Sequence, residues 1–250
     1  MRKLGFFFSC YNEERAVENS IKCLKEFYPD NPIYLVSDGG LDFMYLESLF
    51  KNIKVSLEED TMSSTFSVTR DNYLEEVHQE TNRIAAWAVL NRLERAIEYC
   101  QSEYILMMDP DALIRGTLTI PDGVKLLGSR VNKGFPKGFR DLLSRIEGAK
   151  VIDCWGATPG IFHVETFKKS LKMLKETPEV LDMFIKEFHA IYAHDVLLPL
   201  MFALVGEEET FNPEIIECNR DPRWRNTNHP LVHQYKGPSE KDKLVISRQY

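Results

Sequence analysis

The sequence has no long hydrophobic run. Its longest uncharged stretch is residues 196–206, which includes Pro199, whereas a membrane-spanning helix needs about 20 apolar residues. The apolar start, residues 4–10, is short and runs into Asn12 and a charged segment without a cleavage site, which argues against a signal peptide. We therefore expect no transmembrane anchor, a cytoplasmic location, and a buried first strand at residues 4–10.

Cysteine is also scarce, and basic residues are fewer than acidic ones. The five cysteines are widely spaced, and no Cys-x-x-Cys occurs, which favours reduced, buried thiols. The 31 Lys and Arg against 38 Asp and Glu give a net charge of −7, which argues against general binding to nucleic acids or anionic membranes, although local basic patches could hold phosphates. At 250 residues with 44% hydrophobic composition, the chain is typical of a soluble globular protein.

The first 115 residues alternate short apolar runs with helical patterns, as in strand-helix-strand units that build a mostly parallel sheet. Strands are predicted at residues 4–10, 33–37, 53–57 and 104–108, and helices at 13–27, 41–50 and 70–100. In the longest helix, apolar residues from Leu74 to Ile97 recur at spacings of three and four, so one face can pack on the sheet. Residues 116–160 are rich in glycine and predict loops around short elements; helical patterns return at 164–176, 179–188 and 195–205.

Two carboxylates follow the fourth predicted strand. Asp109 and Asp111 lie at its carboxyl end, where open α/β sheets bind ligands. In an extended chain, residues two apart share one face, so both carboxylates can approach one cation, and Mg²⁺ and Mn²⁺ prefer such oxygen ligands. An Asp-Pro-Asp turn in which Asp109 caps the bend explains the triplet equally well.

Polar residues also end the first two strands, so that an ordered set runs through the first half of the chain: Ser9, Tyr11, Asn12, Asp38, Gly39, Gly40, Asp109 and Asp111. This set resembles the nucleotide-sugar half of GT-A type glycosyltransferases. The resemblance implies an α/β, GT-A fold with a single Rossmann-like, mixed and mostly parallel sheet flanked by helices. It further implies one domain over residues 1–250, with a nucleotide-binding half at 1–115 and an acceptor- and metal-completing half at 116–250.

The resemblance also implies roles for single residues. Tyr11 would stack on the base, with Ser9 and Asn12 beside it, and Asp38 would hydrogen-bond the base. Asp109 would reach the ribose or the metal, Asp111 would bind the metal, and Arg83 would face the nucleotide from the long helix. Structural alternatives stay open: a strand-end aromatic for Tyr11, a helix N-cap for Asp38 and a solvated helix charge for Arg83.

A second group of residues is His194-Asp195 before an apolar run. Because Pro199 lacks an N–H and is tolerated only near a helix start, the helix is expected to begin close to Asp195. Asp195 is then either an N-cap carboxylate or, by resemblance to inverting GT-A enzymes, the base that takes the proton of the acceptor hydroxyl. The family often has an acidic residue before that Asp, where this chain has His194.

Two further segments resemble parts of the same family. Two histidines, His229 and His233, lie four apart, but the proline after His229 argues against a zinc-binding helix. The segment resembles a C-terminal element in which His233 would complete the metal shell and Lys236 would meet the diphosphate. Trp155 and Gly156 resemble the stretch beneath the donor sugar, where glycine permits close approach; a core Trp beside a turn is the alternative.

Together these features predict a metal-dependent hexosyl- or pentosyltransferase. It would use Mn²⁺ or Mg²⁺ and move a sugar from a nucleoside-diphosphate donor, with UDP or GDP as the nucleotide, to a hydroxyl of a glycan or other acceptor, with inversion and Asp195 as base. A sugar nucleotidyltransferase is one alternative, which the absence of glycine from residues 11–25 disfavours. A non-catalytic carbohydrate- or nucleotide-binding protein of the same fold is the other.

Overall fold

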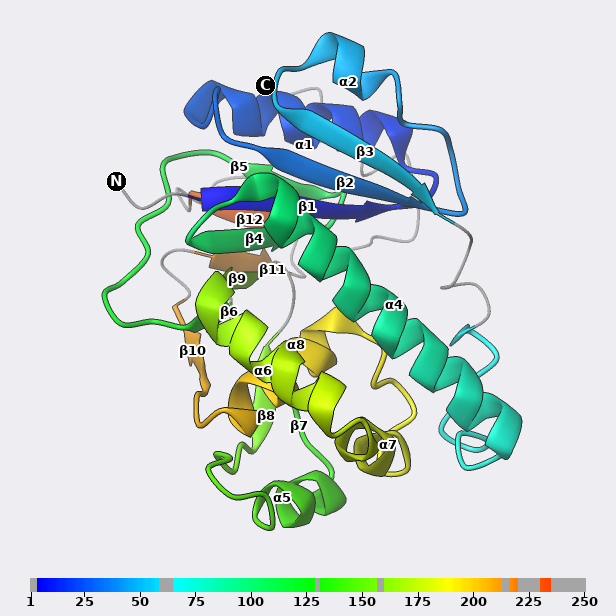
Figure 1. The fold of residues 1–250 in the computed structure, drawn as a ribbon. Helices are drawn as coiled ribbons and strands as arrows, with labels where there is room; N and C mark the ends of the chain where they lie inside the picture. Colours follow the sequence, from blue (N-terminus) through cyan, green and yellow to red (C-terminus); the bar gives the residue numbers. More distant parts are fainter. Residues whose placement is uncertain are drawn as a thin grey trace.

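A twisted sheet of seven strands forms the centre of the molecule (Figure 1). The computed structural model describes residues 4–58, 65–128, 131–156, 160–212, 216–219 and 230–234. The strand order is β10-β6-β9-β4-β1-β2-β3, and β9 alone runs antiparallel to its neighbours. This mostly parallel, mixed sheet flanked by helices is the fold class that the sequence predicted.

The predicted strands of the first half are confirmed almost to the residue. They are β1 (Leu4–Cys10), β2 (Ile33–Asp38), β3 (Ile53–Glu58) and β4 (Tyr104–Met108). Because β2 and β4 are buried throughout, their sequences are near-continuous apolar runs. The second half supplies β6 (Leu126–Gly128), β9 (Gly160–His163) and β10 (Glu209–Phe211), so one sheet contains strands from both halves of the chain.

Helices cover both faces of the sheet and enclose two hydrophobic cores (Figure 1). Alternate residues of β1 enter opposite cores, with Phe6 and Phe8 in one and Phe7 in the other. The first core is closed by α1 (Glu14–Phe27) and α2 (Leu46–Leu49). The second is closed by α4 (Glu76–Cys100), α5 (Lys137–Leu143), α6 (Val164–Glu176), α7 (Glu179–Ile185) and α8 (His194–Leu204).

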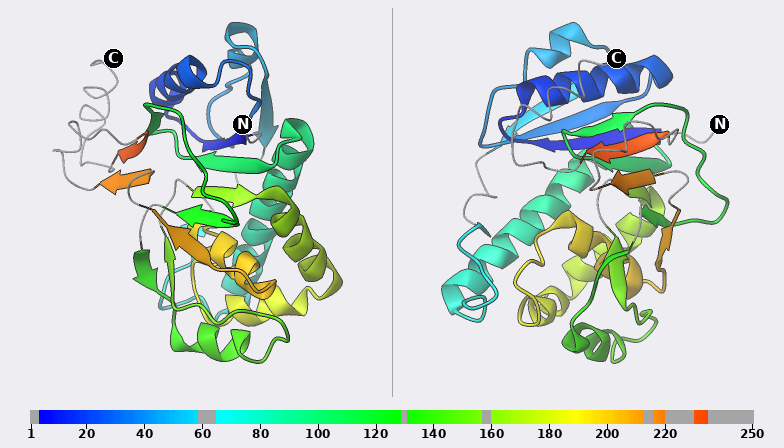
Figure 2. Two further views of the ribbon diagram at one scale, coloured as in Figure 1. Left: turned by 90° about the vertical axis from the view of Figure 1, so that its left-hand side faces the viewer. Right: turned by 180° about the vertical axis from the view of Figure 1, so that it is seen from behind.

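Two small sheets complete the described structure. One has the order β11-β12-β5, formed by β11 (Ile216–Asn219), β12 (Leu231–Gln234) and β5 (Ala112–Ile114). Figure 2 shows β11 and β12 side by side at the margin of the molecule. The other pairs β7 (Val131–Gly134) with β8 (Cys154–Gly156). Through β5, the first small sheet is joined directly to the carboxyl end of β4.

Two helix predictions are wrong in extent. The helix predicted at residues 41–50 is only the single turn α2, because Leu41 is held in a loop: its N–H donates to the Tyr11 carbonyl at 2.8 Å, and its own carbonyl accepts from Ser37 Oγ at 2.5 Å. The helix predicted from residue 70 begins at Glu76, since the Asn72 side chain closes a turn by accepting from the Thr69 N–H at 2.7 Å.

The first half of α4 also lacks the buried apolar face that its spacing predicted. Leu74, which precedes α4, and Val77 and Ile84 within it are more than half exposed, whereas the buried apolar positions of α4 begin at Ala85. Figure 1 shows the reason, because the amino-terminal part of α4 projects beyond the edge of the sheet. That part of the helix therefore borders the carboxyl ends of the parallel strands.

Among the cysteine side chains that the structure describes, none forms a disulfide bond, and two of them, Cys10 and Cys100, are buried as predicted. Cys23 and Cys154 are partly buried. Within the described ranges, no helix combines the length and the hydropathy needed to cross a membrane.

Candidate functional site

The turn after β4 places Asp109 and Asp111 at the carboxyl edge of the parallel strands. The Ala112 N–H donates to the Asp109 carbonyl at 3.0 Å, which closes the turn and starts β5. Asp111 is 7% exposed, and the Asp109 side chain is 21% exposed. The Asp-Pro-Asp turn is therefore present, and the same turn delivers two carboxylates to the ligand-binding edge of the sheet.

Strand β12 brings the backbone of His233 to the same place. It runs antiparallel to β5, with His233 opposite Ala112, the residue that follows Asp111. The sequence predicted a strand that crosses the site at His233, and the register puts a strand there. Lys236 and His229 lie outside the described residues, so their roles stay predictions.

The start of α8 meets the turn after β4 from the other side. His194 is the first residue of α8, and its Nε2 lies 3.8 Å from Asp109 Oδ1. Asp195 follows in the first turn. The N-cap position belongs to Ala193, which has extended backbone angles, so the prediction of Asp195 as a possible N-cap is wrong. Two groups of residues that are distant in sequence thus come together.

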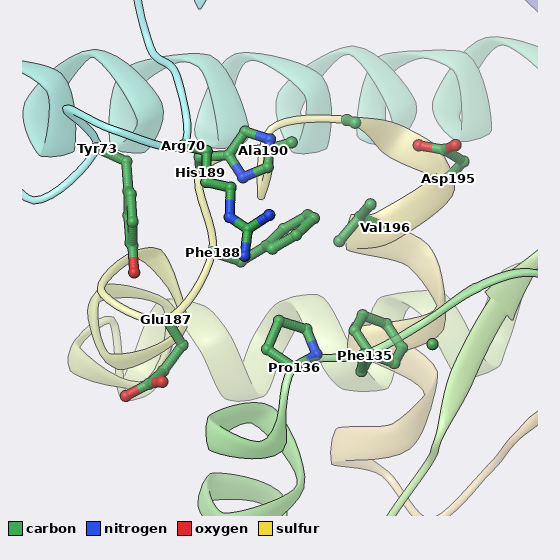
Figure 3. Close-up of a pocket in the computed structure, with 12 residues that line it drawn as sticks. Arg70, Tyr73, Phe135, Pro136, Glu187, Phe188, His189, Ala190, Asp195 and Val196 are labelled. Atoms are coloured by element: carbon green, nitrogen blue, oxygen red, sulfur yellow. The ribbon is translucent and has the colours of Figure 1, made fainter.

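Asp195 lines a cavity of about 720 Å³ beside this junction (Figure 3). The walls come from four segments: the stretch before α4, the link between β7 and α5, the loop between α7 and α8, and the start of α8 itself. The lining residues used below are Arg70, Tyr73, Phe135, Glu187, Phe188 and His189. In Figure 3 Asp195 lies at one end of this cavity, and Tyr73 and Arg70 lie toward the other.

Asp38 is buried at the end of β2 and forms an ion pair. Its Oδ1 accepts from Arg92 Nη2 at 2.6 Å, and Arg92 Nε donates to Glu58 Oε2 at 2.7 Å. The N-cap interpretation of Asp38 is wrong, because the next helix begins only at Leu46. Its role at a nucleotide base stays a prediction. Arg92 was missed, since a single arginine in a helical pattern looks like a surface charge.

The ends of β1 and β2 are locked together beside these residues. A Cβ on Gly40 would overlap the backbone carbonyl of Tyr11, so only glycine permits this contact. Tyr11 is 45% exposed, Asn12 is exposed and Ser9 is partly buried. The structure thus presents the predicted nucleoside-binding residues at the edge that carries Asp109 and Asp111, and their contacts with a nucleotide stay predictions.

Arg83 lies on α4 against α7 and is engaged by two carboxylates. Its Nε donates to Asp182 Oδ1 at 2.6 Å, and its Nη1 pairs with Glu80. The hydrogen bond that Arg83 donates to Asp182, together with the negative charges of Asp182 and Glu80, raises the pKa of the guanidinium. The two ion pairs are enough to explain why an arginine lies on this face of α4. A role of Arg83 at the nucleotide stays a prediction.

Glu209 is a titratable residue near Asp195 that the sequence analysis did not single out as a site residue. Its Oε2 accepts from the Gly156 N–H at 2.7 Å, and its carboxylate fills the space that side chains at Gly128 and Gly156 would occupy. The space beside Gly156 is therefore occupied by the Glu209 carboxylate. Burial, together with the negative charge of Asp195, raises the pKa of Glu209 to about 8. Trp155, beside Gly156, lies in β8 opposite Lys133, and its role beneath a sugar stays a prediction.

The raised pKa of Glu209 predicts a pH-dependent stability. Between about pH 4.5 and 8 the folded state keeps a proton that the unfolded chain releases, so stability falls as pH rises through this window. Glu209→Gln cannot ionise and should gain on the order of 2 kcal/mol relative to the natural protein between pH 5 and pH 7, or about 4–8 °C in melting temperature.

Thermal unfolding of both proteins at the two pH values measures this difference. Glu208→Gln is the matched control, because the Glu208 side chain is 58% exposed and pairs with Lys150 at 2.8 Å. Equal pH dependence in the two variants would contradict a Glu209 that keeps its proton in the folded state.

Comparison with known proteins identifies the fold. No protein-family model and no curated protein matches the sequence. Among solved structures, the chain is similar to the galactosyltransferase LgtC in complex with donor and acceptor sugar analogues, with 13% identity and a TM-score of 0.50. It is also similar to an active-site mutant of LgtC, with 13% identity and a TM-score of 0.55. Each match covers 98% of this chain and 95% of the other. The chain therefore has the GT-A fold of these glycosyltransferases.

Proposed function

We propose that this protein is a metal-dependent glycosyltransferase that moves a sugar from a nucleoside diphosphate to a hydroxyl acceptor. One observation carries the proposal: the start of α8 meets the turn after β4, where His194 Nε2 lies 3.8 Å from Asp109 Oδ1. This contact brings the start of the helix that carries the predicted base, Asp195, next to the turn that carries the predicted metal ligands, Asp109 and Asp111. Both lie at the ligand-binding edge of a fold shared with a galactosyltransferase.

The predicted metal ligands have the chemistry that a hard divalent cation requires. Asp109 and Asp111 offer carboxylate oxygens, and His233 offers an imidazole nitrogen, a set that suits Mn²⁺ or Mg²⁺. Among the described side chains, no group of three potential ligands is assembled; the third member, His233, is placed only by its backbone in β12. A bound cation would offset the charge that develops on the leaving diphosphate.

The acceptor side is assigned to the cavity that Asp195 lines. As the acceptor oxygen attacks the anomeric carbon, Asp195 takes the hydroxyl proton, and the bond between the sugar and the diphosphate breaks. The proton ends on Asp195 and the nucleoside diphosphate leaves, so the step needs no further reactant. A single displacement of this kind inverts the anomeric centre, which NMR of the product measures directly.

Metal-linked nucleotide binding tests the proposal. Calorimetry of UDP- and GDP-sugars should show binding that strengthens with Mn²⁺ in the natural protein. In Asp111→Ala this strengthening by Mn²⁺ should be lost, and the rate of donor hydrolysis should fall by at least about 10²-fold. Asp30→Ala is the control, because Asp30 is an exposed aspartate before β2, at the opposite edge of the sheet.

Two outcomes would overturn the assignment. Metal-linked binding that survives in Asp111→Ala would remove the metal site from the turn after β4. A natural protein that binds the sugar nucleotide without turnover under any metal would instead be the non-catalytic binding protein that the sequence left open.

A further inference from the structure

The cavity beside Asp195 contains a cation that no residue of the described structure neutralises. The Arg70 side chain is exposed and points into the cavity toward the Phe188 ring (Figure 3). Within the described ranges Arg70 forms no ion pair and no hydrogen bond. The guanidinium therefore keeps its full set of donors for a ligand.

The one glutamate in the cavity wall is directed elsewhere. The carboxylate of Glu187 packs over the backbone of Gly138 in α5, where an added Cβ would overlap it. In Figure 3 Glu187 points away from the guanidinium of Arg70. The negative charge of Asp195 lies at the other end of the cavity. The cavity is thus polarised, with a cation at one end and the predicted base at the other.

Aromatic rings line the space between these charges. Phe188 and His189 have ring centroids 4.7 Å apart, and Tyr73 meets His189 edge-on at 6.4 Å. Phe135 stacks on Phe139 with centroids 4.8 Å apart, which fixes that wall to α5. Flat apolar walls with a few placed polar groups are typical of small-molecule sites, and ring faces of this kind suit the apolar faces of sugars.

None of the residues that line this cavity belongs to β1, β2 or β4. The predicted nucleotide site lies at the ends of those strands, and the cavity meets it at the start of α8, where Asp195 lines the cavity and His194 Nε2 lies 3.8 Å from Asp109 Oδ1. The ligand that reaches Arg70 is therefore assigned to the acceptor side rather than to the donor diphosphate.

We propose that the acceptor is an anionic sugar, whose carboxylate or phosphate binds Arg70 while a hydroxyl of the same molecule faces Asp195. This inference rests on the proposed function. Arginine presents paired N–H groups that match carboxylate and phosphate oxygens. The aromatic residues Tyr73 and Phe188 would hold the sugar ring between the two charged ends of the cavity.

Binding measurements on matched sugars test this inference without requiring turnover. Calorimetry compares methyl glucoside, methyl glucuronide and glucose 6-phosphate, which differ in charge at one position. We expect at least about 10-fold tighter binding of the anionic members, and the two anionic arms tell a carboxylate from a phosphate preference. In Arg70→Gln the ratio of anionic to neutral affinity should fall to about 1, and Arg70→Lys should lie between. Lys186→Gln, on the exposed carboxyl end of α7, is the control and should keep the ratio.

Transfer assays then separate the inference from the proposed function. A fall of 10- to 100-fold in kcat/KM for anionic acceptors in Arg70→Gln, expressed mainly in acceptor KM, is the supporting result. Equal binding of neutral and anionic sugars by the natural protein would overturn the inference. So would an Arg70→Gln effect on donor KM alone, because it would move Arg70 to the donor. A natural protein without donor hydrolysis would contradict the proposed function, whereas the binding ratios would still decide the role of Arg70.

Discussion

Replacing Arg92 by leucine is expected to lower the free energy of unfolding by about 3–5 kcal/mol. The Arg92 side chain is 2% exposed, and it pairs with the buried Asp38 and with Glu58. Burial alone would lower the pKa of this guanidinium, but the hydrogen bonds and charges of the two acids outweigh burial and raise it. Leucine would remove those hydrogen bonds and leave the Asp38 carboxylate buried without its arginine.

Urea denaturation of Arg92→Leu and Arg95→Leu measures the effect against a matched control. Arg95 binds the same Glu58, but its side chain is 44% exposed, and an exposed ion pair contributes about 0–1 kcal/mol. A loss in Arg92→Leu that is no larger than the loss in Arg95→Leu would show that burial of the Asp38 pair contributes little. Because Asp38 ends β2, the same variant should also weaken sugar-nucleotide binding if Asp38 contacts the base.

The strands were predictable because a strand that is buried on both faces has a near-continuous run of apolar residues. Strands β1 and β4 are apolar runs that end at polar residues, and their bounds follow from that contrast alone. Helix α2 was overpredicted, because the bond between Leu41 and Tyr11 joins residues that only the folded sheet brings together. The amino-terminal part of α4 has apolar residues at helical spacing, but these residues are buried only where a sheet lies beneath the helix, and the sequence does not show where the sheet ends.

The candidate site was predictable to the extent that strand ends fix it. The positions of Asp109 and Asp111 follow from the end of β4, since the carboxyl edge of a parallel sheet is a known place for ligands. Glu209 was not predictable, because its cradle joins Gly128 with Gly156 across two strands of different sheets. Arg70 lies in a segment without regular periodicity, and only the loop between α7 and α8 turns that segment into a cavity wall.

Asp195→Asn is expected to lower the rate of sugar transfer by about 10²- to 10⁴-fold while the protein still binds the sugar nucleotide. Asparagine has nearly the same shape but cannot take the proton of the acceptor hydroxyl. Asp195 lies in the first turn of α8 and is not its N-cap, so the loss of its charge should cost only about 0.3–1 kcal/mol of stability. Transfer rates, donor affinity by calorimetry and thermal unfolding measure the three quantities separately.

Glu165→Gln is the matched control for Asp195→Asn, because Glu165 is also an acid in the first turn of a helix, α6, and its side chain is 72% exposed. Both variants lose a charge that favours a helix start, but only Asp195 lines the cavity. A pure helix-terminus role for Asp195 would therefore give the two variants the same small drop in melting temperature and leave transfer intact in both. A large loss of transfer in Asp195→Asn alone, with donor affinity retained, would place the acceptor hydroxyl at the start of α8.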